Sequence, residues 1–232
     1  MSVPEKFQRA RSEEQRAARR RAILDTAAGM LTEMPVSQVT LNELSRRVGL
    51  AKSNVLRYFE SREDVLLELL AAASAELLGH LEQTLAGALD AVPPADRPDR
   101  LAGCLARALA DRPVLCDLIS AQAAVLERNV SPQIAAQYKR AAIAHAAALA
   151  ALVAARLPAL GERDAFRFVA GALMVTGAVW THAHPSAAMA AAYEEDPALA
   201  VLRLDFTDTL RQTLEVLLSG LLARAGGSGL GS

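Results

Sequence analysis

The amino-acid sequence predicts an all-α protein, and two features of its composition support this. Alanine supplies 49 of the 232 residues, and alanine favours helix because it loses no side-chain entropy there. Aromatic residues make up only 4% of the chain, and no alternating run of β-branched residues supports a sheet. With 52% hydrophobic and 22% charged residues, the chain is able to bury a substantial core.

The first two helices are marked by capping signals. The spacing of Ser12 and Gln15 predicts a helix that begins at Ser12 and ends before Pro35. A second helix is expected after Thr40, because a glutamate three residues later completes a capping box, and Gly49 supplies the turn that ends it.

A short third helix is expected over 52–59, with Val55, Leu56 and Phe59 pointing inward and a polar, partly basic face outward. A long helix follows from about Asp64 to Asp90. Apolar periodicity and Pro or Gly joints predict the remaining helices over 96–111, 113–128, 131–156, 163–180 and 205–224, with one short helix within 184–197.

Positive charge is concentrated in the first quarter of the chain. Residues 1–62 hold 12 Lys and Arg against 7 Asp and Glu, a net charge of +5, whereas the remainder holds 13 against 19, a net charge of −6. Such a basic segment is a candidate for contact with a polyanion. A solvated basic helix explains the charge equally well, so a motif has to decide between the two interpretations.

Several function classes lack support in the sequence. The first residues lack the apolar run of a signal peptide, and the apolar stretches 141–155 and 168–180 are shorter than the roughly 18 to 20 residues that cross a bilayer. We therefore expect a cytoplasmic protein without membrane contact. No nucleophile elbow, phosphate loop or dinucleotide fingerprint is present, which argues against an enzyme and against a cofactor.

Metal binding is not expected either. His182 and His184 are two residues apart, His80 and His145 stand alone, and no carboxylate completes a helical zinc pair. The two cysteines, Cys104 and Cys116, fall on separate helices and are expected as small core residues.

The pattern of a capped helix, a glycine turn and a short polar helix is that of a helix-turn-helix, whose second helix enters the major groove of DNA. The sequence from Thr40 to Leu66, TLNELSRRVGLAKSNVLRYFESREDVL, resembles the DNA-reading head of the tetracycline-repressor (TetR) family of transcriptional regulators. The resemblance covers roughly residues 15–70.

The resemblance implies a flexible basic arm over 1–11, a three-helix helix-turn-helix DNA-binding domain over 12–63, a larger helical effector-binding and dimerisation domain over 64–225, and a disordered tail over 226–232. It implies a ligand-responsive, sequence-specific DNA-binding regulator, and we expect a homodimeric repressor. Its partners would be double-stranded DNA with a pseudo-palindromic operator and a small-molecule effector.

The side chains divide by what they are able to contact. Thr40 caps a helix whose N-terminus is able to face a phosphate, and Lys52, Tyr58 and Arg62 offer donors to the backbone. Ser53, Asn54 and Arg57 are the candidates for base edges, with Asn42 assisting.

Many family members have Tyr where Leu56 stands, so Tyr58 and Arg57 are expected to replace the phosphate contact of that Tyr. The run Arg19–Arg21 and the preceding Lys6, Arg9 and Arg11 are further candidates for backbone or minor-groove contacts.

Four polar residues interrupt apolar helix faces in the second domain, namely Gln122, Tyr138, His145 and Thr176. A buried polar group requires a partner, which is either another protein group, a water or a ligand. An apolar pocket with a few polar groups is typical of a small-molecule site, and the resemblance implies such a cavity. These four residues are the candidates for effector binding.

The last two long helices are expected to form the homodimer interface. Gly171 and Gly177 would allow close approach of another helix, and a leucine stripe on the final helix would match them, at Leu210, Leu214, Leu217, Leu218 and Leu221. Two alternatives stay open at this point. One is an all-α ligand carrier or enzyme with an incidental basic N-terminus, and the other is a regulator controlled by a protein partner.

Overall fold

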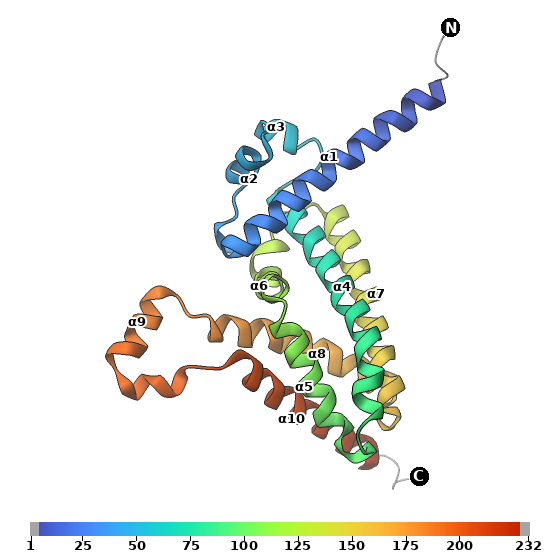
Figure 1. Cartoon of the computed structure of the whole chain (residues 1–232), viewed down its shortest axis with the longest axis vertical. Coiled ribbons are helices and arrows are strands. Elements are labelled where there is room, and N and C mark those ends of the chain that lie inside the picture. Colours follow the sequence, from blue (N-terminus) through green and yellow to red (C-terminus); the bar gives the residue numbers. More distant parts are fainter. Residues whose placement is uncertain (1–4, 228–232) are drawn as a thin grey trace. The chain divides into compact units, whose positions relative to one another are not determined.

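The computed structural model describes residues 5–227, and the side chains of residues 13–226. All regular elements in this part of the chain are helical. The chain forms two compact units, one made of the residues through Leu69 together with Gln122–Ala135, the other of Leu70–Ala121 and the residues from Ala136 onward. Helices α4 (Arg62–Asp90) and α7 (Pro132–Arg156) run from one unit into the other (Figure 1).

The first unit contains α1 (Glu5–Glu33), the 3₁₀ turn η1 (Val36–Gln38), α2 (Leu41–Val48), α3 (Lys52–Val55) and the start of α4. Helix α1 begins at Glu5, so the expected start at Ser12 is wrong, and residues 5–11 of the expected basic arm are helical; residues 1–4 lie outside the described residues. The segment from Glu5 to Ser12 contains neither Pro nor Gly, so nothing in it stops a helix from extending.

The core of the first unit is built from α1, α2, the segment after α3 and α4. Its largest fully buried side chains include Ile23, Met30, Leu44, Phe59 and Leu66. Because these residues come from four separate segments, burial of their apolar surface holds the short helices α2 and α3 against α1.

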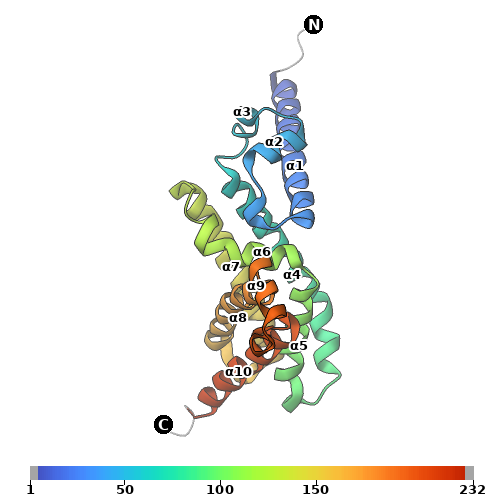
Figure 2. The same ribbon diagram turned by 90° about the vertical axis from the view of Figure 1, so that its left-hand side faces the viewer.

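The second unit is an all-helical body in which α10 (Phe206–Gly227) packs against α5 (Arg97–Ala110) and α8 (Gly161–Ala183), and α6 (Pro113–Ala121) packs against α8 (Figure 2). Helix α9 (Ala187–Glu195) follows α8. Short 3₁₀ turns lie at η2 (Pro94–Asp96), η4 (Pro158–Leu160) and η5 (Pro197–Leu202). Most of the expected disordered tail, residues 228–232, lies outside the described residues.

The helix expected over 113–128 is broken. Helix α6 ends at Ala121, and the π-helical turn η3 (Gln122–Leu126) follows, closed by a hydrogen bond from the Glu127 N–H to the Gln122 carbonyl oxygen (3.1 Å). Apolar periodicity continues through this point without Pro or Gly, so the sequence carries no signal of the break. The segment 122–135 thereby becomes part of the first unit.

Candidate nucleic-acid interface

Helix α2 is capped at both ends as the sequence predicts. The Thr40 hydroxyl accepts a hydrogen bond from the Glu43 N–H (3.1 Å). Gly49 has φ = +72°, and its N–H donates to the Arg46 carbonyl (3.2 Å) while the Leu50 N–H donates to the Ser45 carbonyl (3.0 Å). This pair of bonds is a Schellman motif, which favours glycine because other residues are strained at positive φ. The turn sets the direction in which α3 leaves α2.

Helix α3 is shorter than expected. It ends at Val55, and the chain then tightens, with the Tyr58 N–H donating to the Val55 carbonyl (2.9 Å). Val55 and Phe59 are buried as predicted, but Leu56 is 42% exposed, so the expectation that it points inward is wrong. The tighter turn after α3 changes the angular spacing of the side chains, so the α-helical pattern does not apply there.

The polar residues proposed from the sequence lie mostly on the surface of this unit. The exposed ones are Thr40, Asn42, Lys52, Ser53, Asn54 and Arg57. Tyr58 is half-buried. Arg62 is different, because its side chain is only 18% exposed and its Nε lies 3.6 Å from the Glu63 carboxylate.

Arg20 has a role that the sequence did not indicate. Its guanidinium donates to the Tyr58 carbonyl oxygen (2.6 Å), lies 4.1 Å from the centre of the Phe59 ring and forms an ion pair with Glu68. It therefore ties α1 to α4 and to the end of residues 52–60, which we call the recognition segment. The sequence showed only a run of three arginines, and no local spacing distinguishes the member that turns inward.

Two further arginines are also engaged within the unit. The Arg47 side chain bonds to Glu43 (2.9 Å) on its own helix and to Glu33 (2.6 Å) at the end of α1. Hydrogen bonds from Arg46 and then from Arg47 lower the pKa of Glu43 to about 2. These contacts neutralise part of the positive charge that the sequence placed in this region.

The start of α4 is anchored by two reciprocal contacts. The Ser61 hydroxyl accepts from the Asp64 N–H (3.2 Å), and the Asp64 carboxylate accepts from the Glu60 N–H (2.9 Å). Burial raises the pKa of Asp64. The Glu60 carboxylate in turn accepts from the Ser131 hydroxyl (3.0 Å) and N–H (3.3 Å). The end of the recognition segment is therefore fastened to α4 and to the segment 122–135.

Comparison with known protein families agrees with this geometry. The family described as "Bacterial regulatory proteins, tetR family" matches residues 23–69, which include α2 and α3. The family described as "Tetracyclin repressor-like, C-terminal domain" matches residues 69–225. The chain belongs to the TetR family. It is accordingly a DNA-binding transcriptional regulator, and proteins of this family are generally not enzymes.

Solved TetR-family structures share the fold. A possible TetR-family regulator from Streptomyces coelicolor A3(2) is 22% identical, with 88% of this chain and 98% of that chain covered and a TM-score of 0.58. FadR from Bacillus subtilis, in complex with stearoyl-CoA, is 15% identical, with 86% and 97% covered and a TM-score of 0.54. A TetR regulator from Rhodococcus sp. RHA1 is 14% identical, with 89% and 96% covered and a TM-score of 0.54. A search of curated proteins finds no match.

The four residues proposed for effector binding do not share one unit. Gln122 belongs to the first unit, where its amide donates to the Glu127 carboxylate (2.8 Å). Thr176 is fully buried in the second unit, and its hydroxyl donates to the Ala172 carbonyl (2.7 Å). Tyr138 is buried and His145 half-buried on α7. The polar groups of Gln122 and Thr176 therefore have protein partners already.

Two surface depressions lie among the described residues of the second unit. One, of about 670 Å³, is lined mainly by α7 alanines such as Ala147, Ala151 and Ala155, and by Phe166 of α8. The other, of about 280 Å³, lies between the end of α8 and the segment before α10, with His182, Tyr193 and Arg203 in its wall. The larger one is predominantly apolar, and most of the residues that line it are exposed, so it is a depression open to solvent.

Part of the leucine stripe assigned to the dimer interface faces the interior of the chain, as does Gly177. Leu210, Leu214 and Leu218 are fully buried where α10 packs within its own unit. A Cβ on Gly177 would lie 3.3 Å from the Ser120 Cα, and one on Gly171 would lie 3.6 Å from a Leu217 methyl. Leu210, Leu214, Leu218 and Gly177 are therefore used in packing within the chain, whereas Leu217 and Leu221 are only half-buried, and the homodimer through the C-terminal helices stays a prediction. The apolar residues on the outer faces of α8 and α10 are Phe166, Met174 and Val216, the last two each 72% exposed.

The two cysteines, predicted from the sequence as small core residues, are buried to different extents. Cys116 is fully buried, and burial with the neighbouring Asp117 raises its pKa to about 12. Cys104, half-buried, accepts a hydrogen bond from Arg107 (3.7 Å).

Among the residues with described side chains, no three His, Cys, Asp or Glu are grouped as metal ligands. Within residues 5–227, no single helix is long and apolar enough to span a membrane; only Pro132–Arg156 and Pro158–Ala183 together pass that test, bent by 114°.

Proposed function

We propose that this TetR-family protein is a cytoplasmic, non-enzymatic homodimeric repressor that binds a pseudo-palindromic operator and is released from it by a small, largely apolar effector. The observation that carries the proposal is the exposed polar run Lys52-Ser53-Asn54 on a helix pinned by the Gly49 turn and by Arg20. A rigid, polar short helix of this kind suits the major groove of DNA.

Within that run, Ser53 and Asn54 are the candidates for base edges, since an asparagine amide matches the donor and acceptor of adenine. Lys52, the helix N-terminus after Thr40 and the Tyr58 hydroxyl are proposed to contact phosphates, with Asn42 beside them. Arg62 is proposed as a further phosphate ligand, although its guanidinium has to turn away from Glu63 to reach DNA.

The test is selection of bound duplexes from a random DNA library, followed by binding measurements on the selected sequence. A palindromic result is expected. Asn54→Ala should cost on the order of 1 to 3 kcal/mol and relax preference at particular base pairs, whereas Lys52→Ala should weaken all sequences similarly. Unchanged affinity and sequence preference in Asn54→Ala would remove Asn54 from the reading face.

The dimer is proposed to form through the outer faces of α8 and α10. These faces carry Met174 and Val216, each 72% exposed, and a second copy packed there would remove both from water. Two copies related by a two-fold axis would present two α3 helices to half-sites roughly 34 to 36 Å apart. Light scattering of the wild type at micromolar concentration should give twice the monomer mass, and a monomer would contradict the proposal.

The effector is proposed to bind in the second unit, with Tyr138, His145 and Thr176 as candidates and Gln122 as an outlying fourth. The support is the mainly apolar depression of about 670 Å³ beside α7 and α8, which α7 alanines and Phe166 line; none of the four candidate residues lines it, so the candidates and the depression are tested separately. A ligand acts only through its different affinities for the DNA-bound and released states, and coupling of roughly 1 to 3 kcal/mol is ordinary.

Stearoyl-CoA is the first probe to try, because the B. subtilis FadR was solved with it. Release of operator by increasing stearoyl-CoA should be impaired in His145→Ala and in Ala151→Phe, which fills the depression. Gln122→Ala serves as a comparison, since its amide is occupied by Glu127. Unaltered release in His145→Ala would remove His145 from the site, and unaltered release in Ala151→Phe would remove the depression beside α7 and α8.

A further inference from the structure

A groove of about 720 Å³ lies between α1 and the residues that follow α3. The side chains that line it include Arg16 and Arg19 of α1 together with Arg57 and Tyr58, and none of the lining residues with a described side chain is a carboxylate. The three arginines are exposed. A concave surface with three guanidinium groups and no compensating acid concentrates positive potential and suits an anion with several charges.

The groove is built before any ligand arrives. The Arg16 guanidinium donates to the Arg57 carbonyl oxygen (3.5 Å) and lies 5.9 Å from the centre of the Tyr58 ring. Arg20, one turn further along α1, holds the Tyr58 carbonyl (2.6 Å). The Arg20 bond holds the backbone at Tyr58 in place, while the Arg16 bond is a long contact of an exposed side chain that stays free to turn to a ligand.

The groove also adjoins the reading face. Arg57 and Tyr58 follow directly after Lys52–Val55, the helix proposed to enter the major groove. A duplex on α3 therefore brings its backbone close to Arg16 and Arg19, and duplex DNA carries about one negative charge per 1.7 Å of its axis. A guanidinium group is able to donate two hydrogen bonds to the oxygens of one phosphate, which makes arginine a common phosphate ligand.

We propose that this groove holds phosphates of one operator strand beside the half-site, with Arg16, Arg19 and Arg57 as ligands and the Tyr58 hydroxyl as a further donor. The proposal rests on the DNA-binding function above and assigns Arg57 to the backbone rather than to a base edge. The DNA-binding surface then has two parts, the α3 face for sequence and the groove for register.

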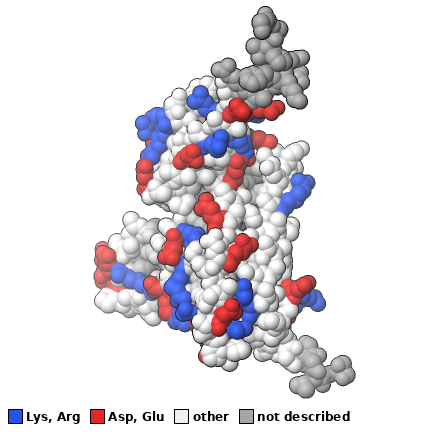
Figure 3. Space-filling model, turned by 45° about the vertical axis from the view of Figure 1, so that its right-hand side comes forward, with Lys and Arg blue, Asp and Glu red and all other residues white. Residues whose placement is uncertain are grey.

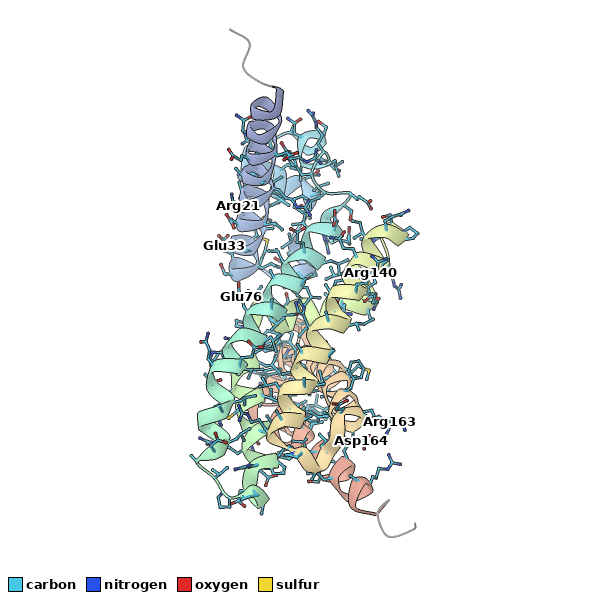
Figure 4. The ribbon with its side chains drawn as sticks, turned by 90° about the vertical axis from the view of Figure 1, so that its right-hand side faces the viewer. Arg21, Glu33, Glu76, Arg140, Arg163 and Asp164 are labelled. Atoms are coloured by element: carbon cyan, nitrogen blue, oxygen red, sulfur yellow. The ribbon has the colours of Figure 1, made fainter. Side chains whose placement is uncertain are left out.

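Helix α1 itself provides a matched control. Arg21 is also exposed but does not line the groove; at 3.6 residues per turn it lies about 140° around the helix from Arg16 and about 160° from Arg19. Figure 4 labels Arg21 on α1. Replacing any of the three by alanine removes the same charge from the same helix, so only the groove distinguishes them.

The experiment measures binding of the full-length protein to the duplex that the wild type selects from a random library, and to a random-sequence duplex of equal length, over a range of salt concentrations. Arg16→Ala and Arg19→Ala should each weaken both duplexes on the order of tenfold. Each should lower the slope of log K against log[salt] by about one per protomer, while Arg21→Ala changes either quantity little. Arg57→Ala should weaken all sequences similarly and keep the base preference.

Phosphate-ethylation interference then locates the contact. Phosphates whose ethylation blocks the wild type but not the Arg16→Ala/Arg19→Ala double variant are those held in the groove, and circular dichroism checks that each variant is folded. Equal effects of the Arg16, Arg19 and Arg21 variants on the selected duplex overturn the groove assignment and leave the proposed function intact. A wild type that selects no duplex overturns both.

Discussion

Each of the two units of this TetR-family protein is stabilised internally by a different kind of contact. In the first unit, polar side chains join segments far apart in the sequence, as Arg20 does with Tyr58, Arg47 with Glu33 and Glu60 with Ser131. In the second, many of the polar bonds stay within one turn of one helix, as for Thr176 with Ala172 and Arg211 with Asp208, and apolar packing joins the helices.

This difference matches what each unit has to do. Hydrogen bonds and ion pairs are directional, so they hold a short recognition segment in one orientation. Apolar packing among alanine-rich and leucine-rich helices is non-directional. Charged side chains of both signs are interspersed over the face of the molecule drawn in Figure 3. The following variants test the comparison, from the largest expected effect to the smallest.

The largest effect is expected from Leu214→Arg compared with Val216→Arg. Leu214 is fully buried against its own unit, so an arginine there becomes an unpaired buried charge and should unfold the second unit. Val216 is 72% exposed, so an arginine there should keep the fold and dissociate the dimer. Circular dichroism and light scattering distinguish the two outcomes, and a folded Leu214→Arg protein would contradict the packing described for α10.

The second-largest effect is expected from Arg20→Ala. It removes a charge-assisted bond to the Tyr58 carbonyl and the pair with Glu68; with the side chain partly exposed, we expect a loss of about 1 to 2 kcal/mol in the free energy of unfolding. Arg21→Ala, exposed on the same helix, should lie within about 0.5 kcal/mol of the wild type. Urea unfolding measures both, and similar values for the two variants would remove the structural role of Arg20.

Gly49→Ala should cost roughly 1 to 2 kcal/mol, because alanine is strained at the positive φ of this turn. No atom lies within 4 Å of an added Cβ, so the cost comes from the backbone alone. Thermal unfolding measures it, with Gly79→Ala within α4 as the control that should be neutral or stabilising. A Gly49→Ala protein as stable as the wild type would show that the turn relaxes.

The smallest effect is expected in the pH dependence of the free energy of unfolding. Arg46 and Arg47 hold the pKa of Glu43 at about 2, below its ordinary 4.5. A lowered carboxyl pKa adds stability that is fully present above the unfolded value, near 4.5, and is lost as the pH falls through the folded value, near 2. Glu43→Gln should therefore flatten the dependence of unfolding free energy on pH between about 4.5 and 2, by little because the group is exposed. An unchanged pH profile would show that this network contributes nothing to stability.

The sequence by itself determined the features that depend on neighbouring residues. The all-α class follows from alanine content and periodicity, the Thr40 cap and the Gly49 turn from residues three to five apart, and the family from the run between Thr40 and Leu66. These signals are local, because helix capping and positive φ are decided within one or two turns of chain.

Only the tertiary structure decided how the remaining side chains are used. The three arginines 19–21 look alike in the sequence, yet Arg20 is bonded inside the unit, Arg19 lines the groove and Arg21 does neither. The leucine stripe of α10 was visible, but whether it faces its own chain or a second copy depends on α5. The sequence likewise carries no signal of the π-helical turn after Ala121. In each case the deciding partner is distant in the sequence, and local periodicity holds no information about it.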